Sequence, residues 1–245
     1  MIGATILAAE ACLRVGVGSV KIICTKETLS ILSHKFPSAL KVEINNPSFL
    51  KSFLRKERKT TNVALVGPGA GKNSKTMKFT EEILKQIKYV ILDADSLNSF
   101  QKKTKKLLRY LDKNKLITPH QAEFHRLFPA IKRNLNNKEK VLKFLKLCKS
   151  NILLKGNTTV IGSSDKIVIN KHTSSELAVI GSGDVLAGII TSLVGDKKMS
   201  MNEAASAATW IHGDIAKRHG RGLISEDLIR GIPSALQRLK KWVNY

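Results

Sequence analysis

The chain has 245 residues, 42% of them hydrophobic, which is enough for one large α/β domain with a sizeable core. It carries 42 Lys and Arg against 19 Asp and Glu, a formal net charge of +23, but only 5% of its residues are aromatic. Because the basic residues are scattered and few rings are available to stack on bases, the pattern favours phosphate-bearing small molecules over nucleic acid.

Cysteine usage and hydropathy predict the cellular compartment of the chain. The three cysteines are odd in number and far apart, so we expect reduced thiols, with Cys12 and Cys24 in the core. The apolar start, Met1 to Gly16, has no basic region and is interrupted by Glu10, which is not the pattern of a signal peptide. No apolar run approaches the roughly 18 residues of a membrane span. We therefore expect a soluble, cytoplasmic protein.

Helix-like and strand-like segments alternate along the chain. Helical spacing predicts helices at 3–16, 26–33, 74–88, 136–150, 184–194, 201–218 and 225–242. Short apolar runs predict strands at 19–24, 62–66, 89–95, 115–120, 151–156, 158–164 and 166–170. This alternation predicts an α/β fold with a mostly parallel sheet covered by helices on both faces, in a single domain over 1–245. Ligands of such sheets bind outside the carboxyl ends of the strands.

A glycine-rich stretch, VGPGAGKNS, follows the strand at 62–66. It is not a Walker A loop, because Val66 stands where that motif needs its first glycine and Asn73 replaces the Ser or Thr after the lysine. Two interpretations remain open: a strand-to-helix turn whose amides face an anion or a sugar, and a tight structural turn.

Three further strand ends carry polar residues. Asp93 and Asp95 are placed on one face of the strand at 89–95, where they would hold Mg²⁺ through water or, alternatively, cap a helix. His120 follows the next strand; a lone histidine is more often structural than catalytic, and the histidine spacing does not indicate zinc. Lys155 and Gly156 occupy a turn that either meets a nucleotide or simply closes a β-hairpin.

The stretch GSGD, residues 181–184, stands directly before an apolar helix. The first amides of a helix have no intrahelical partner, so Gly181 and Gly183 predict an anion hole. Asp184 in the first turn is either a general base for phosphoryl transfer to a hydroxyl or merely a helix-favoured residue.

Taken in order, six segments resemble the ADP/ATP-dependent NAD(P)H-hydrate dehydratase family, which has a ribokinase-like fold, a three-layer α/β sandwich. They are GATILAAEACLRVGVGSV, VGPGAG, ILDADSLN, ITPHQAEFHRLFP, LLKGNTTVIG and GSGDVLAGII. The later AASAATWIHGDIA and GLISEDLIRGIP match as well, so the resemblance runs from Gly3 to about Leu239.

The resemblance implies a hydro-lyase that repairs nicotinamide nucleotides. The S epimer of hydrated NADH or NADPH would be phosphorylated on its hydroxyl by ADP or ATP with Mg²⁺, and phosphate would then leave. Asp184 would be the base, and Gly181 and Gly183 would supply the anion hole. The positions matching nucleotide contacts are Lys155, Gly156, Asn157, Thr158, Thr159 and Gly183, and those matching substrate contacts are Ala4, Gly69, His120 and Asp184.

The sequence departs from the family pattern in three ways. The usual first strand and glycine turn before Gly3 are not seen, which would leave a sheet edge or a gap beside the substrate. Ser174, Ser175 and Val179 replace a Gly-Asn-Pro and Ala-Thr pattern ahead of GSGD. The attached epimerase of many relatives is not seen either, so we expect a separate epimerase protein, and we also expect a homo-oligomer, such as a tetramer. The alternatives are a small-molecule kinase of the hydroxyethylthiazole type and a catalytically impaired, basic nucleic-acid-binding relative.

Overall fold

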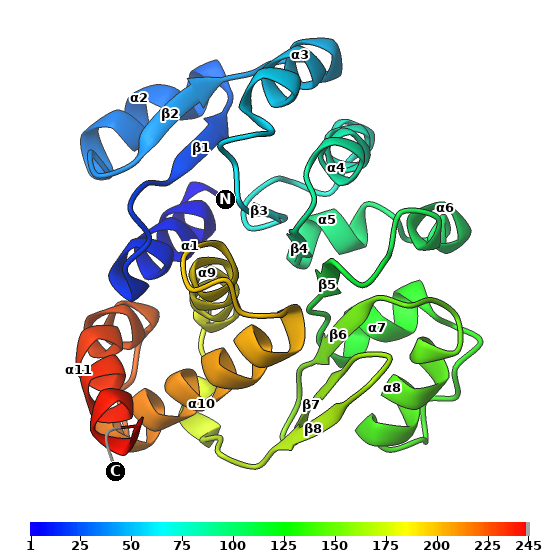
Figure 1. Ribbon diagram of the computed structural model, residues 1–245, viewed down its shortest axis with the longest axis vertical. Coiled ribbons are helices and arrows are strands. Elements are labelled where there is room, and N and C mark those ends of the chain that lie inside the picture. The colour runs from blue at the N-terminus through cyan, green and yellow to red at the C-terminus, as the bar shows by residue number, and fades with distance from the viewer. Residues whose placement is uncertain (244–245) are drawn as a thin grey trace.

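A six-stranded sheet forms the middle layer of the molecule in this computed structural model, which describes residues 1–243 (Figure 1). Strands β3 to β6 run parallel, and β6, β7 and β8 are antiparallel neighbours. In sheet order they are β3 (Ala64–Val66), β4 (Val90–Leu92), β5 (Lys115–Ile117), β6 (Asn151–Leu154), β7 (Thr159–Gly162) and β8 (Ile167–Asn170). The carboxyl ends of the parallel strands therefore lie together at one end of the sheet.

Helices cover both faces of this sheet (Figure 1). One face is covered by α1 (Ile2–Val15), α9 (Ser182–Gly195), α10 (Met201–His219) and α11 (Ser225–Val243). The opposite face is covered by α3 (Pro47–Glu57), α4 (Ser74–Gln86), α5 (Ala94–Asn98), α6 (Thr104–Leu108), α7 (Gln121–Leu127) and α8 (Asn137–Leu145). The expected three-layer α/β arrangement is confirmed.

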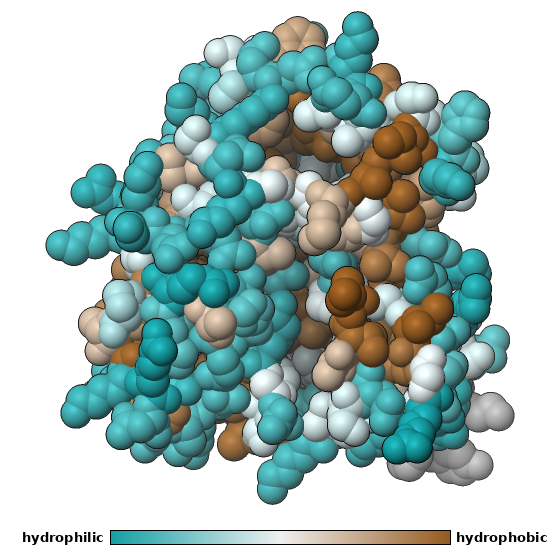
Figure 2. All heavy atoms as spheres, turned by 180° about the vertical axis from the view of Figure 1, so that it is seen from behind, coloured by the Kyte–Doolittle hydropathy of each residue, from teal (hydrophilic) through white to brown (hydrophobic). Residues whose placement is uncertain are grey.

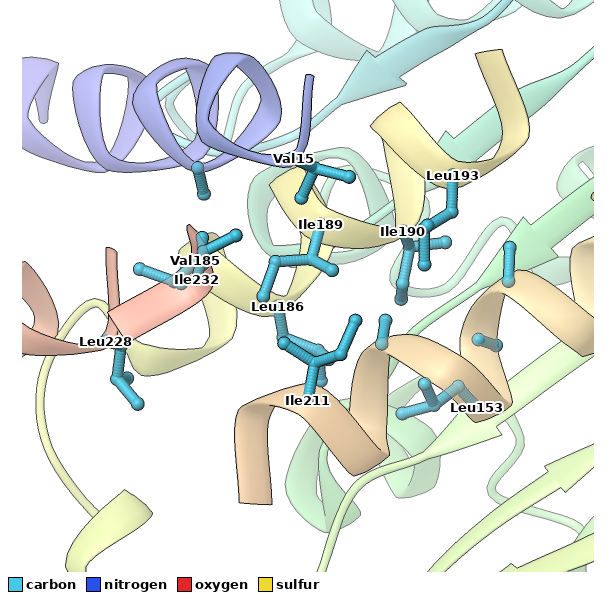
Figure 3. Close-up of a cluster of buried hydrophobic side chains, with 14 of the residues drawn as sticks. Val15, Leu153, Val185, Leu186, Ile189, Ile190, Leu193, Ile211, Leu228 and Ile232 are labelled. Atoms are coloured by element: carbon cyan, nitrogen blue, oxygen red, sulfur yellow. The ribbon is translucent and has the colours of Figure 1, made fainter. Parts of the chain in front are cut away.

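Alternation along the strands divides the core into two clusters. On β4, Ile91 packs into one cluster, whereas its neighbours Val90 and Leu92 pack into the other, because successive side chains of a strand point to opposite faces. Figure 3 shows the first cluster, in which α9 lies between α1, α10 and α11. Nearly every residue of α9 is buried, so the start of this helix is held by packing on several sides.

Two strands stand apart from the main sheet. β1 (Lys21–Cys24) and β2 (Leu40–Glu43) form a separate parallel pair, with α2 (Lys26–Lys35) packed on it through a small apolar cluster. β1 is not hydrogen-bonded to β3. β1 and β3 therefore each have an open edge.

Most of the predicted elements are confirmed, with ends that shift by a few residues. The predicted strand at 89–95 is wrong in its second half, because β4 ends at Leu92 and Asp93 begins a short helix. The elements that were not predicted are β2, α3, α6, α7 and the 3-10 turn η1 (Ser175–Leu177), whereas a helix after Asp93, here α5, was one of two open interpretations. Cys12 and Cys24 are buried free thiols, as expected. Among the described residues, no helix has the length and apolar character needed to cross a membrane.

Candidate active site

Asp184 lies in the first turn of α9. The N-cap residue of this helix has a backbone conformation that only glycine adopts easily. Gly181 has a φ of 87°, in the left-handed region, and makes no side-chain cap. Burial, with the nearby charges of Asp93 and Asp95, raises the pKa of Asp184 to about 6, and Lys155 opposes this shift. A carboxyl group that titrates near neutral pH is suited to accept a proton from a hydroxyl group.

Lys155 directly follows β6 and reaches toward the start of α9. Its Nζ donates to Oδ1 of Asp93 at 2.8 Å, and its side chain is 22% exposed. Burial alone would lower the pKa of Lys155, but the carboxylates of Asp93, Glu123 and Asp184 raise it, so the ammonium stays charged. A Cβ added to Gly183 would lie 3.3 Å from this Nζ. The ammonium therefore lies against the first turn of α9, where helix amides have no intrahelical partner, and the two define a candidate anion site.

Asp93 and Asp95 do not share the face of a strand, which corrects that expectation. Asp93 is 2% exposed and accepts from Thr118 Oγ1 and Lys155 Nζ, both at 2.8 Å. After Ala94 turns the backbone with a φ of 45°, Asp95 accepts from the Gly71 amide at 2.8 Å. Asp93 occupies the N-cap position of α5 but makes no side-chain cap. The described residues contain no group of three or more His, Cys, Asp or Glu arranged to hold a metal.

The glycine-rich turn at 67–71 packs against the start of α1. Thr5 Oγ1 donates to the Pro68 carbonyl at 3.0 Å, which brings Ala4 and Gly69 to neighbouring positions. Gly67 has a φ of 132°, and a Cβ on it would lie 1.7 Å from the Asp93 carbonyl oxygen. The structural interpretation of this turn therefore holds, because the turn fixes the backbone from which Asp93 projects.

This close approach makes Gly67 a sensitive position. We expect Gly67→Ala to lower the free energy of unfolding by about 3 kcal/mol or more, because both the φ angle and the backbone contact oppose a side chain. Gly18→Ala is the matched control, since an added Cβ there meets nothing within 4 Å, and it should change stability by less than about 0.5 kcal/mol. Urea unfolding of the two variants measures the difference, and equal midpoints would contradict it.

His120 follows β5 and caps α7. Its Nδ1 accepts from the amides of Ala122 at 3.1 Å and Glu123 at 3.4 Å, and the Glu123 carboxylate accepts from the His120 amide in return. Burial lowers the pKa of His120, so the ring is neutral near pH 7. The structural role expected of a lone histidine is thus present. The backbone of His120 also pairs with that of Lys155 through a parallel bridge, so the two residues are neighbours at the carboxyl ends of β5 and β6.

The turn at 155–158 joins the antiparallel strands β6 and β7, so the hairpin interpretation is correct for the backbone. Amide side chains from α7 and α8 hold it: Gln121 Nε2 donates to the Lys155 carbonyl at 3.3 Å, and Asn137 Nδ2 donates to the Thr158 carbonyl at 2.7 Å. Gln121 also donates to Asn137 at 2.8 Å. The turn is therefore pre-formed next to the Lys155 ammonium.

Two contacts were not expected from the sequence, although both residues lie in motifs that carried the resemblance. His212 of α10 contacts Ser182, the residue between Gly181 and Gly183, through its Nε2. Ser225, at the start of α11, donates to the Ile180 carbonyl at 2.6 Å. Both residues hold the backbone of GSGD from other helices.

A cavity of about 700 Å³ lies at the opposite end of the sheet, between the starts of the strands and the end of α9. Its lining includes Tyr89, Lys113, Asn151 and Gly195 but none of the predicted site residues. The candidate site is therefore chosen by the convergence of a titratable carboxylate, a charged ammonium and the first turn of α9 at the carboxyl ends of the parallel strands, rather than by cavity size.

The fold defines a class: ribokinase-like α/β proteins. A ribokinase-like protein from Enterococcus faecalis has the same fold, with a TM-score of 0.83, 22% identity, and 96% of this chain and 82% of that one covered. Within this class, the family model described as NAD(P)H-hydrate dehydratase matches residues 1–234, so the chain belongs to the NAD(P)H-hydrate dehydratase family.

Individual relatives agree with this membership. The ADP-dependent (S)-NAD(P)H-hydrate dehydratase of Neisseria meningitidis is 34% identical, over 88% of this chain and 72% of that protein. The ADP/ATP-dependent NAD(P)H-hydrate dehydratase of Bacillus subtilis, co-crystallised with ATP and Mg²⁺, has a TM-score of 0.76 and 23% identity, and the match covers 97% and 87% of the two chains. The chain spans about half the length of the curated bifunctional repair enzymes it also matches, 48% of one of them.

Proposed function

We propose that this chain dehydrates the S epimer of hydrated NADH and NADPH at the expense of ADP or ATP, and so restores the active dinucleotide. The arrangement of Asp184, with its pKa raised to about 6, beside an anion site made by the α9 amides and Lys155 carries this proposal. Membership of the dehydratase family supports the choice of substrate.

The chemistry follows from the poor leaving ability of hydroxide. Asp184 takes the proton of the hydrate hydroxyl, whose oxygen attacks the terminal phosphorus of the nucleotide while the bond to the departing AMP or ADP breaks. The α9 amides and the Lys155 ammonium hold the charge on the transferred phosphoryl group. The lone pair of the ring nitrogen then expels phosphate, and loss of a proton from the neighbouring ring carbon restores the dihydronicotinamide.

The proposed contacts divide between the two ligands. The nucleotide lies on the pre-formed turn of Lys155, Gly156, Asn157, Thr158 and Thr159, with Gly183 at its phosphates. The hydrated dinucleotide lies between Ala4, Gly69 and His120, within reach of Asp184. This assignment is supported by the neighbouring positions of Ala4 and Gly69, and by the bridge between His120 and Lys155.

Magnesium fits this site as an ion that enters with the nucleotide. Mg²⁺ keeps several waters and needs only one or two carboxylates besides phosphate oxygens. Asp95 fits that role better than Asp93, whose charge is already paired with Lys155. When bound, the ion would neutralise phosphate charge.

A turnover assay tests the proposal. Purified protein is mixed with hydrated NADPH, Mg²⁺ and either ADP or ATP, and the dihydronicotinamide absorbance is followed. We expect recovery that depends on nucleotide, and the more effective nucleotide identifies the phosphate donor. A phosphorylated hydrate that accumulates without recovery would indicate a kinase of the same fold, and no reaction from folded protein would contradict the substrate.

Three finer properties complete the proposal. An epimerase acts alongside this chain to supply the S epimer, which is supported by the bifunctional repair enzymes among the relatives. The chain forms a homo-oligomer, such as a tetramer, and works in the cytoplasm. Mass measurement in solution and fractionation of cells test the last two.

A further inference from the structure

The start of α9 lacks the side-chain cap that four other helices of the chain have. The N-cap side chains of α3, α4, α8 and α10 accept from amides of their own first turn; these are Asn46, Asn73, Asn136 and Ser200. At α9 the N-cap is Gly181, which has no side chain to do so. A capping oxygen would occupy an amide that the proposed anion site needs. The first turn of α9 must therefore be fixed in another way.

His212 provides a contact that leaves those amides free. Its Nε2 lies 3.1 Å from both the hydroxyl and the carbonyl oxygen of Ser182, the first residue of α9. A carbonyl oxygen only accepts, so the contact to it requires the Nε2–H form, whose single N–H is shared between the two oxygens of Ser182. His212 holds this turn from α10 without contacting an amide of Gly183 or Asp184.

Burial of His212 and Ser182 keeps the imidazole ring neutral at this contact. Both partners are buried, Ser182 at 4% and His212 at 6% exposure. Burial lowers the pKa of His212 to about 4, so the ring is neutral at pH 7. Ser225 fixes the other side of the turn through the Ile180 carbonyl, and a Cβ added to Gly181 would lie 2.9 Å from the Ser225 hydroxyl oxygen. The turn is thus held from α10 and α11 together.

We infer that His212 is a positioning residue: through Ser182 it holds the α9 amides and the Asp184 carboxylate in the geometry that phosphoryl transfer needs. The part of this inference that concerns turnover rests on the proposed function. The expected effect on phosphate binding does not depend on which molecule accepts the phosphoryl group. Misplacement of such groups by about 1 Å can cost roughly 100-fold in rate.

Two replacements of His212 separate positioning from packing. His212→Gln places an amide N–H near the position of Nε2, whereas His212→Met fills similar space without a donor. We measure ADP affinity by calorimetry, and kcat and KM with hydrated NADPH. For His212→Met we expect kcat to fall about 10- to 100-fold and ADP affinity to fall about tenfold. For His212→Gln we expect both quantities to stay within about threefold of wild type. His34→Met, on the exposed face of α2, is the control and should change neither quantity.

The outcomes distinguish this inference from the proposed function. A folded His212→Met variant with wild-type kcat and ADP affinity would overturn the positioning role, as would a folded His212→Gln variant impaired as much as His212→Met. If His212→Met does not fold, His212→Asn, whose amide is too short to reach Ser182, takes its place beside His212→Gln. If wild type binds ADP but does not convert the hydrate, the proposed substrate fails, and the ADP affinities alone decide the role of His212.

Discussion

Asp184→Asn is expected to fold normally and to lose about 10³-fold in turnover, because a general base contributes roughly 10²- to 10⁴-fold and an amide cannot accept the hydroxyl proton. The amides of α9 and Lys155 remain in place, so ADP affinity should change far less than kcat. Stopped assays with hydrated NADPH measure the first quantity and calorimetry measures the second. Asp196→Asn, at the far end of the same helix, is the matched control and should keep full turnover.

The raised pKa of Asp184 leads to two predictions, one for the pH dependence of kcat/KM and one for the pH dependence of stability. Since the base must be ionised, kcat/KM should rise with pH through an acidic limb near pH 6. Since its pKa is higher in the folded chain than the ordinary 3.8, the carboxyl group favours folding while protonated, and this contribution is lost as the pH rises from about 4 to about 6. Asp184→Asn should therefore be at least as stable as wild type at pH 8.

A variant that keeps near wild-type turnover would remove Asp184 from the role of base. A variant that is less stable than wild type at pH 8 would instead show that the carboxylate is held favourably in the folded state. Thermal unfolding at pH 5 and pH 8 tests the stability prediction, because only the wild type should lose, between these two pH values, the stability linked to protonation of residue 184.

The sequence predicted the start of α9 because the signal there is local. Glycines followed by an acid and an apolar run indicate a helix start whose amides lack an intrahelical partner, without reference to the rest of the chain, whereas the left-handed conformation of Gly181 is a finding of the structure. The long helices α1, α10 and α11 were found for a similar reason, since their apolar periodicity extends over several turns. Local signals were also present for α3, where Asn46 caps the helix and Pro47 takes its first position, but the helix was not predicted.

What the sequence did not predict is which distant residues pair. The sequence leaves Asp93 as a metal ligand or a helix cap, whereas its carboxylate pairs with Lys155, 62 residues away in the chain. Ser182 and His212 are separated by 30 residues and meet only because α9 packs on α10. The short helix α7 was missed because its cap is a histidine and it has only 7 residues, too few for a periodic pattern.

Lys155→Met is expected to abolish nucleotide binding and also to destabilise the fold. The Asp93 carboxylate, 2% exposed, would keep its bond from Thr118 but lose its only counter-charge among the described ion pairs. Leaving one charge of a buried pair without its partner costs about 3–5 kcal/mol. Lys85→Met breaks an exposed pair with Glu82 and is the matched control, with a cost below about 1 kcal/mol.

The double variant Asp93→Asn with Lys155→Met separates the two effects of Lys155. Asparagine keeps an acceptor for Thr118 but carries no charge, so most of the lost stability should return, which urea unfolding measures as a coupling between the two sites. ADP binding should not return, because the ammonium beside Gly183 is still missing. A double variant that is stable and binds ADP as wild type does would show that Lys155 serves only Asp93, and the anion site would then consist of the α9 amides alone.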